Sequence, residues 1–146
     1  MNTFIIIKFG EENYGVEIEL AREIIRIPPV ITPVPGMPPF LRGVINLRGK
    51  ILPVVDFRDR LNVKVGEFKE SSRVVVCEIN EESFGFIVDE IVGIVKVEGD
   101  LLTVSQVIAP AESEYIIGAM RIGNRIISIL NLPEIYRELE RECMQI

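Results

Sequence analysis

The stretch YGVEIELAREIIRI, residues 14–27, decides the fold, because a similar stretch, FGFIVDEIVGIVKV, occupies residues 84–97. At this offset of 70 residues, nine of the fourteen aligned pairs keep their chemical character. A second pair of segments, RGKILPVVDF (48–57) and GNRIISILNL (123–132), matches at seven of ten positions with an offset of 75. Two matches in the same order predict a duplicated unit of about seventy residues, with pseudo-repeat subdomains at about 1–70 and 71–135.

Each unit has the pattern of about five short strands separated by turn-forming residues. The apolar runs of the first unit lie at 3–9, 14–18, 21–27, 42–47 and 50–57. Between the third and fourth runs lies the proline-rich connection IPPVITPVPGMPPF (27–40). Because proline donates no backbone hydrogen bond, we expect this connection to be extended and not a central strand. Short strands with closely spaced turns favour a small barrel, since closure removes exposed edges.

The end of the chain has the pattern of a helix, at about 132–143. Asn131 can cap it, Glu134 stands three residues on as in a capping box, and Pro133 lies in the first turn. One face carries apolar side chains at helical spacing, namely Leu132, Ile135, Tyr136, Leu139 and Cys143. We expect this face to pack against the barrels and the Glu and Arg residues to form a solvated face.

The composition excludes several kinds of function. Sixteen basic and 22 acidic residues give a net charge of −6, and no basic cluster suggests binding to nucleic acid or to an anionic membrane. The chain has no histidine, and Cys77 and Cys143 match no metal-ligand spacing, so we expect neither a cofactor nor a metal. No apolar run approaches the ~20 residues of a membrane span. We expect a cytoplasmic protein without enzymatic activity.

The stretch GVINLRGKILPVVDF (43–57) has some features of a phosphate-binding loop but fails its spacing. Five residues separate Gly43 from Gly49 where the loop needs four, and Ile51 follows Lys50 where a hydroxyl should hold magnesium. We therefore interpret the stretch as two strands joined by a turn at Arg48. An arginine there can simply be solvated, or its planar guanidinium can bind a carboxylate. Glu23 is the candidate partner.

Several blocks of the sequence, in order, closely resemble the chemotaxis coupling protein (CheW) family. They are YGVEIELAREI (14–24), ITPVPGMPPFLRG (31–43), GVINLRGKILPVVDFR (43–58), GFIVDEIVGIVKV (85–97) and YIIGAMRIGNRIISILNL (115–132). The resemblance covers about residues 3–137 and implies one CheW-like domain over 1–146. It implies an all-β fold of two SH3-like five-stranded β-barrels packed together, with a C-terminal helix. It also implies a non-enzymatic adaptor that couples chemoreceptor cytoplasmic tips to the chemotaxis histidine kinase, in receptor arrays at the membrane.

The resemblance further implies two protein-binding surfaces. In this family the receptor tip packs into an apolar groove between the subdomains, and the matching positions here are Ile18, Ala21, Glu23, Ile24, Arg48 and Ile94. The regulatory domain of the kinase is expected to dock on the first subdomain around Val34, Met37, Phe40 and Gly43. Ala21 stands where the family commonly has a larger aliphatic residue, which affects the expected shape of the groove rim.

Two alternatives remain open at this point. A coupling protein with the same fold could serve a non-flagellar chemosensory pathway. A small-molecule sensor could use the groove between the barrels as a pocket, although the missing histidine and the failed phosphate-loop spacing count against it.

Overall fold

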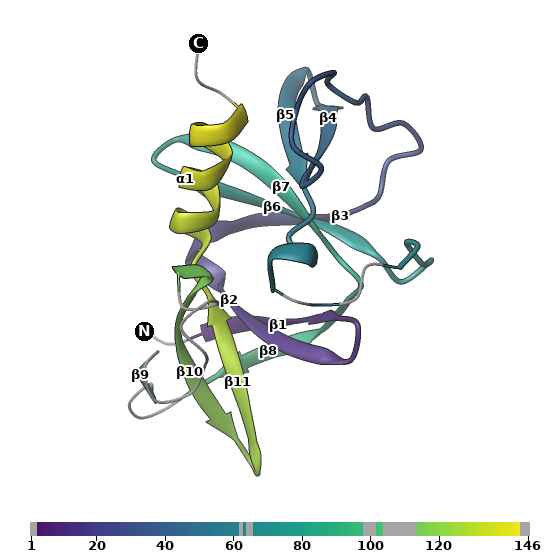
Figure 1. The fold of residues 1–146 in the computed structure, drawn as a ribbon. Helices are drawn as coiled ribbons and strands as arrows, with labels where there is room; N and C mark the ends of the chain where they lie inside the picture. The colour runs from purple at the N-terminus through teal and green to yellow at the C-terminus, as the bar shows by residue number, and fades with distance from the viewer. Residues whose placement is uncertain (1–2, 62, 64–65, 98–101, 104–113, 144–146) are drawn as a thin grey trace.

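The computed structural model describes residues 3–61, 63, 66–97, 102–103 and 114–143 (Figure 1). Most of these residues lie in strands, and one α-helix ends the described chain. The strands are β1 (Thr3–Phe9), β2 (Glu12–Glu17), β3 (Ala21–Arg26), β4 (Leu41–Leu47), β5 (Lys50–Val55), β6 (Arg73–Ile79), β7 (Glu82–Val88), β8 (Glu90–Lys96), β9 (Leu102–Thr103), β10 (Ile116–Ile122) and β11 (Arg125–Leu130). The helices are the short 3-10 turns η1 (Ile18–Leu20) and η2 (Asp59–Leu61) and the α-helix α1 (Leu132–Cys143).

The strands form two sheets, which confirms the all-β class and the two five-stranded units. One sheet has the order β3-β6-β7-β5-β4, and the other has the order β8-β1-β2-β11-β10-β9. The extra strand of the second sheet, β9, has two residues and pairs with β10 at its edge. The helix expected at the end of the chain is also confirmed, as α1.

The two sheets do not follow the two halves of the sequence, which corrects the expected subdomains at about 1–70 and 71–135. The first hairpin of each half joins the sheet of the other half: β1 pairs antiparallel with β8, and β6 pairs antiparallel with β3. The strand orders nevertheless match one for one, because β3, β6, β7, β5 and β4 occupy the places of β8, β1, β2, β11 and β10. The duplication seen in the sequence therefore underlies two similar sheets that have exchanged hairpins.

Two glycines at equivalent positions leave room for side chains that pack directly over them. Gly15 on β2 lies opposite Ile129 of the parallel strand β11, and Gly85 on β7 lies opposite Val54 of the parallel strand β5. A Cβ atom at Gly15 would lie 2.5 Å from Met120 Cε, and one at Gly85 would lie 2.6 Å from a Val74 methyl group. Any larger residue would have to displace these packed side chains.

The largest core cluster contains residues of both sheets and of α1. Three aromatic rings cross it, with Phe57 5.3 Å from Phe40 and 5.6 Å from Tyr115 between ring centroids. Helix α1 begins where Asn131 Oδ1 accepts a hydrogen bond from the Glu134 backbone N–H at 3.2 Å. Its apolar face is buried as expected, so the helix is part of the core.

A buried ion network joins the two sheets beside this core. The Arg58 side chain is 2 % exposed and makes two hydrogen bonds to Asp56, at 3.0 and 2.8 Å, and one to Asp89 at 3.1 Å. Asp89 lies between β7 and β8, where the chain passes from one sheet to the other, and its second oxygen accepts the Gly10 N–H at 2.5 Å. The hydrogen bonds to Asp56 raise the pKa of Arg58 despite its burial.

Candidate functional site

The turn between β4 and β5 holds its arginine in a strained backbone conformation. Arg48 has φ = 50° and Gly49 has φ = 84°, so both residues of this two-residue turn are left-handed, as in type I′ hairpins. A residue with a Cβ costs about 1–2 kcal/mol in this conformation. The equivalent turn of the other sheet begins with Gly123, at φ = 60°, which carries no such cost. Asn80 and Glu81 in the β6–β7 turn have the same left-handed conformation, so strain alone assigns Arg48 no role, and its side-chain contact has to be considered.

That side chain pairs with the carboxylate expected from the sequence. Arg48 Nη2 donates a hydrogen bond to Glu23 Oε1. Glu23 is on β3, at the edge of the sheet opposite to β4. The Arg48 side chain is 70 % exposed and that of Glu23 is 29 % exposed. An ion pair this exposed contributes about 0–1 kcal/mol to stability. Its effect is to fix the position of two opposite charges on the surface.

The remaining residues of the expected receptor surface lie on or beside two edge strands. Ile18 and Ala21 are half-buried against the central core, whereas Ile24 on β3 is 40 % exposed. Ile94, on β8, is 64 % exposed. β3 and β8 are equivalent edges of the two sheets, and the offset of 70 aligns Ile24 with Ile94. The structure thus brings Glu23 and Arg48 into contact, while Ile94 stands on the other sheet and pairs with β1.

The residues expected to contact the kinase fall into two groups. Val34 is half-buried and Met37 is 36 % exposed, so both have side chains at the surface. Phe40 is 4 % exposed and packs against Phe57, so its ring cannot be a contact. Gly43, at φ = 145°, is also buried, and a Cβ there would clash with the Thr32 carbonyl. The structure therefore corrects the expectation that Phe40 and Gly43 contact the kinase. Both residues instead support the surrounding chain.

The proline-rich connection itself is anchored to the first sheet. Thr32 and Val44 exchange two backbone hydrogen bonds, of 3.0 and 2.9 Å, which hold the connection against β4. Because Gly43 has no side chain, the connection can lie this close.

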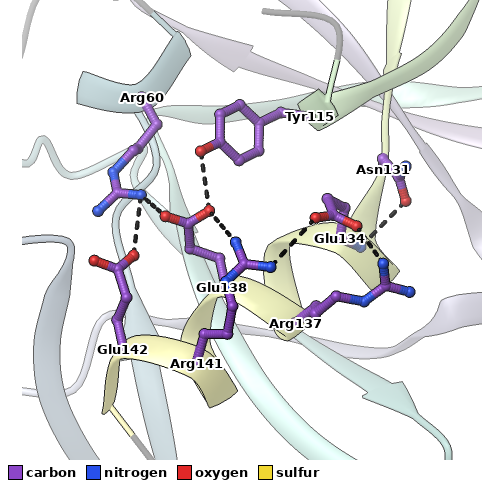
Figure 2. A network of polar contacts seen from close by, with 8 residues as sticks. All are labelled: Arg60, Tyr115, Asn131, Glu134, Arg137, Glu138, Arg141 and Glu142. Carbon is purple, nitrogen blue, oxygen red and sulfur yellow. Dashed lines mark hydrogen bonds and ion pairs between the residues drawn. The ribbon is translucent and has the colours of Figure 1, made fainter.

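A polar network joins α1 to η2, as Figure 2 shows. Glu138, 6 % exposed, accepts hydrogen bonds from Arg60, from the Tyr115 hydroxyl at 3.0 Å and from Arg141 at 3.2 Å. The Arg60 guanidinium also lies 4.4 Å above the Phe40 ring centre. Glu138 thus corrects the expectation that the charged residues of this helix are all solvated. The network fixes α1 beside the segment that leads from Phe40 into β4.

Burial also shifts the ionisation of core groups. Burial raises the pKa of the Tyr115 hydroxyl, and its hydrogen bond to Glu114 acts in the same direction. Burial raises the pKa of the Cys77 thiol, which is fully enclosed in β6. A thiol that stays protonated is a poor nucleophile.

The described residues contain no group of three or more Cys, Asp or Glu side chains placed to hold a metal ion. Within the same part of the chain, α1 and the 3-10 turns are all too short or too polar to cross a membrane. The features that stand out at the surface are instead exposed aliphatic side chains next to a fixed ion pair, as in protein-binding scaffolds.

Comparison of the sequence with known proteins identifies its family. Residues 3–140 match the model of the CheW-like domain. The chain is 32 % identical to "Chemotaxis protein CheW" of Rhizobium meliloti over 140 residues, which cover 95 % of this chain and 90 % of that protein. It is 33 % identical over 85 residues to "Protein PilI" of Pseudomonas aeruginosa, covering 58 % of this chain and 47 % of that protein.

A solved structure with a similar fold also belongs to a protein named CheW. The crystal structure of scaffolding protein TtCheW from Thermoanaerobacter tengcongensis superimposes with a TM-score of 0.82 at 27 % identity, covering 90 % of this chain and 84 % of that one. The fold defines a protein of two β-sheets that is similar to this scaffolding protein. The chain belongs to the CheW-like domain family.

Proposed function

We propose that this protein couples the cytoplasmic tips of chemoreceptors to the chemotaxis histidine kinase without enzymatic activity of its own. It acts in the cytoplasm, held at membrane receptor arrays by protein contacts. The observation that carries the proposal is the Glu23–Arg48 ion pair, fixed by a strained turn next to an exposed aliphatic edge strand. Such a pattern of apolar contact area beside fixed charges suits protein recognition.

The proposed receptor surface comprises Ile18, Ala21, Glu23, Ile24, Arg48 and Ile94. Exposed Ile24 and Ile94 supply the apolar area that the helical tip of a receptor can cover. The ion pair fixes where charged groups of the receptor tip can bind, and this sets the position of the tip along the surface.

The proposed kinase surface is on the proline-rich connection, with Val34 and Met37 as contacts. Proline restricts the backbone, so little conformational entropy is lost when a partner binds there. Phe40 and Gly43 hold this connection in place from beneath, through the core and through the close approach to Thr32.

The test replaces Arg48 in two ways. Arg48→Gly removes the side chain but suits the left-handed turn, so stability should stay the same or rise by about 1 kcal/mol. Binding to a receptor cytoplasmic fragment, measured by isothermal titration calorimetry, should weaken. Arg125→Gly, at an exposed position of the β10–β11 hairpin, is the control and should leave binding unchanged.

A charge swap then tests the pair itself. Arg48→Glu and Glu23→Arg should each weaken receptor binding, and the double variant should recover part of it. If the effects of the two single variants simply add, the ion pair does not organise the surface. If Arg48→Gly binds the fragment as tightly as the wild type, the receptor surface lies elsewhere.

A coupling protein of a non-flagellar chemosensory pathway remains the second candidate. The observation that favours it is the similarity to "Protein PilI", which is named differently from the chemotaxis proteins. Deleting the gene and measuring swimming in a chemical gradient separates the two functions. The loss of a non-flagellar coupling protein should leave swimming unaffected.

A further inference from the structure

The turn that carries Arg48 is held by a side chain as well as by the backbone. Leu47 and Lys50 are the last paired residues of β4 and β5, so Arg48 and Gly49 lie beyond the ladder of the two strands. The Gly49 N–H donates a hydrogen bond to Asn46 Oδ1 at 3.0 Å. Asn46 is an exposed residue of β4, two positions before Arg48. A side chain of the strand thus fixes the second residue of the turn.

This hydrogen bond acts on the backbone of Arg48. The Gly49 nitrogen belongs to the planar peptide unit that also contains the Arg48 carbonyl. Holding the N–H in one direction therefore holds ψ of Arg48, the torsion that rotates this peptide unit. Arg48 is left-handed, with φ = 50°, in a region that residues with a Cβ seldom adopt. Asn46 therefore stabilises Arg48 in a conformation that its own backbone disfavours.

The glycine of the turn is required by the same conformation and not by lack of space. A Cβ atom at Gly49 would meet nothing within 4 Å. Gly49 has φ = 84°, and a type I′ turn needs a positive φ at both of its central residues. The acceptor of Asn46 and the glycine thus favour one turn type, which sets the direction in which the Arg48 side chain leaves the hairpin.

The other half of the protein has different residues at these positions. The offset of 75 aligns Asn46 with Arg121 and Arg48 with Gly123. A guanidinium group carries no acceptor atom, so Arg121 cannot hold its turn in this way. Gly123, with φ = 60°, needs no such support, because glycine adopts a left-handed conformation without strain. The acceptor is therefore present in the half whose turn presents an arginine.

The direction of the Arg48 side chain decides its contact. Arg48 Nη2 donates to Glu23 on β3, so the ion pair joins the hairpin of one edge strand, β4, to the opposite edge strand of the same sheet. The Arg48 side chain is 70 % exposed, so packing does little to restrict its rotamers. The backbone conformation of the turn then has a large part in placing the guanidinium.

We propose that Asn46 is a positioning residue for receptor binding, because its side chain fixes the turn from which the Arg48 guanidinium reaches Glu23. The inference rests on the proposed receptor surface and adds to it a residue that acts through Arg48. Asn46 itself needs no contact with the receptor tip.

Asn46→Val tests the inference, because it removes the acceptor from an exposed strand position that valine suits. Binding of a receptor cytoplasmic fragment, measured by isothermal titration calorimetry, should weaken about two- to tenfold, as expected for the loss of one hydrogen bond. Arg121→Val changes the equivalent exposed position of β10 and is the control, which should leave binding unchanged.

Two further measurements separate positioning from a general loss of structure. In NMR spectra of Asn46→Val, relaxation of the Arg48 Nε–H group should show a more mobile side chain, while amide exchange in β6 and β7 stays as in the wild type. In the Arg48→Gly background, Asn46→Val should cause no further loss of receptor binding, because the side chain through which Asn46 acts is gone.

Three results would overturn the inference. They are unchanged receptor binding by Asn46→Val, an equal loss of binding by Arg121→Val, and a loss by Asn46→Val that persists in full in the Arg48→Gly background. If Arg48→Gly weakens binding and Asn46→Val does not, the proposed receptor surface stands and this inference alone fails. If Arg48→Gly also leaves binding unchanged, both fail.

Discussion

The buried network around Arg58 allows a prediction of stability from the structure. Asp56 and Asp89 are 5 % and 7 % exposed, and the Arg58 guanidinium, 2 % exposed, is the cation that contacts both. Removing one partner of such a pair leaves charges buried without compensation, at a cost of about 3–5 kcal/mol. Because Asp89 also holds Gly10 at the β1–β2 turn, the loss should loosen the contact between the sheets.

We therefore expect Arg58→Ala to lower the free energy of unfolding by about 3–5 kcal/mol. A domain is commonly stable by only about 5–15 kcal/mol, so this is a large fraction of the total. Equilibrium urea denaturation at pH 7, followed by circular dichroism, measures it as a fall in the midpoint. Arg58→Lys keeps the charge but not the two parallel hydrogen bonds to Asp56, so its loss should be intermediate. It provides a measurable variant if Arg58→Ala does not fold.

The control is Arg48→Ala, which removes the same charge from a side chain that is 70 % exposed. Its expected loss is about 0–1 kcal/mol. If Arg58→Ala costs less than about 1 kcal/mol, or no more than Arg48→Ala, the network does not hold the sheets together.

Three further predictions concern the core. Gly85→Ala should destabilise by about 1–3 kcal/mol in urea, because the new Cβ meets a β6 side chain at 2.6 Å, whereas Gly93→Ala meets nothing within 4 Å and should be tolerated. The raised pKa of Cys77 keeps its proton bound in the folded state, so stability present below the unfolded pKa of about 8.5 should fall by up to about 1.4 kcal/mol per unit as pH rises above it. Cys77→Val should reduce that slope from pH 9 to 11, leaving the part due to Tyr115 and Tyr136, whose pKa values burial also raises, and an unchanged slope would assign it to other groups. Glu138→Ala should remove the acceptor of the buried Tyr115 hydroxyl and speed hydrogen exchange in α1; equal exchange rates would show that the network does not fix the helix.

The sequence predicted the repeated architecture but not how the repeats pair. The offsets of 70 and 75 identify equivalent strands correctly, because alternating burial leaves the same pattern in both halves. Periodicity says which residues face a core, but a hairpin from either half satisfies the same pattern. The exchange of β1–β2 and β6–β7 depends on long-range pairing, which no local signal in the sequence distinguishes.

Turn chemistry predicted one contact of the candidate site, whose binding role stays a prediction. Arg48-Gly49 between two apolar runs predicted a turn that presents the arginine, and Glu23 was correctly chosen as its partner. The burial of Phe40 was missed because a phenylalanine after prolines fits an exposed contact and a core residue equally well. Its burial depends on Phe57 and Arg60, which approach it only in the folded chain.

The network of Arg58 and Asp89 was not predicted as such. Its signal was present, since VVDFRDRL (54–61) and FIVDEIV (86–92) place charged residues directly after apolar strands. A charge at the end of a strand is usually solvated, so only the meeting of the two segments shows that these are buried.

The adaptor function is tested most directly by asking whether the protein holds both partners at once. Labelled protein is mixed with the regulatory domain of the kinase and a receptor cytoplasmic fragment, and the complexes are separated by size-exclusion chromatography with light scattering. The expected result is one complex that contains all three proteins, which Arg48→Gly weakens on the receptor side alone. Failure to bind either partner, or competition between the two for one surface, would contradict it.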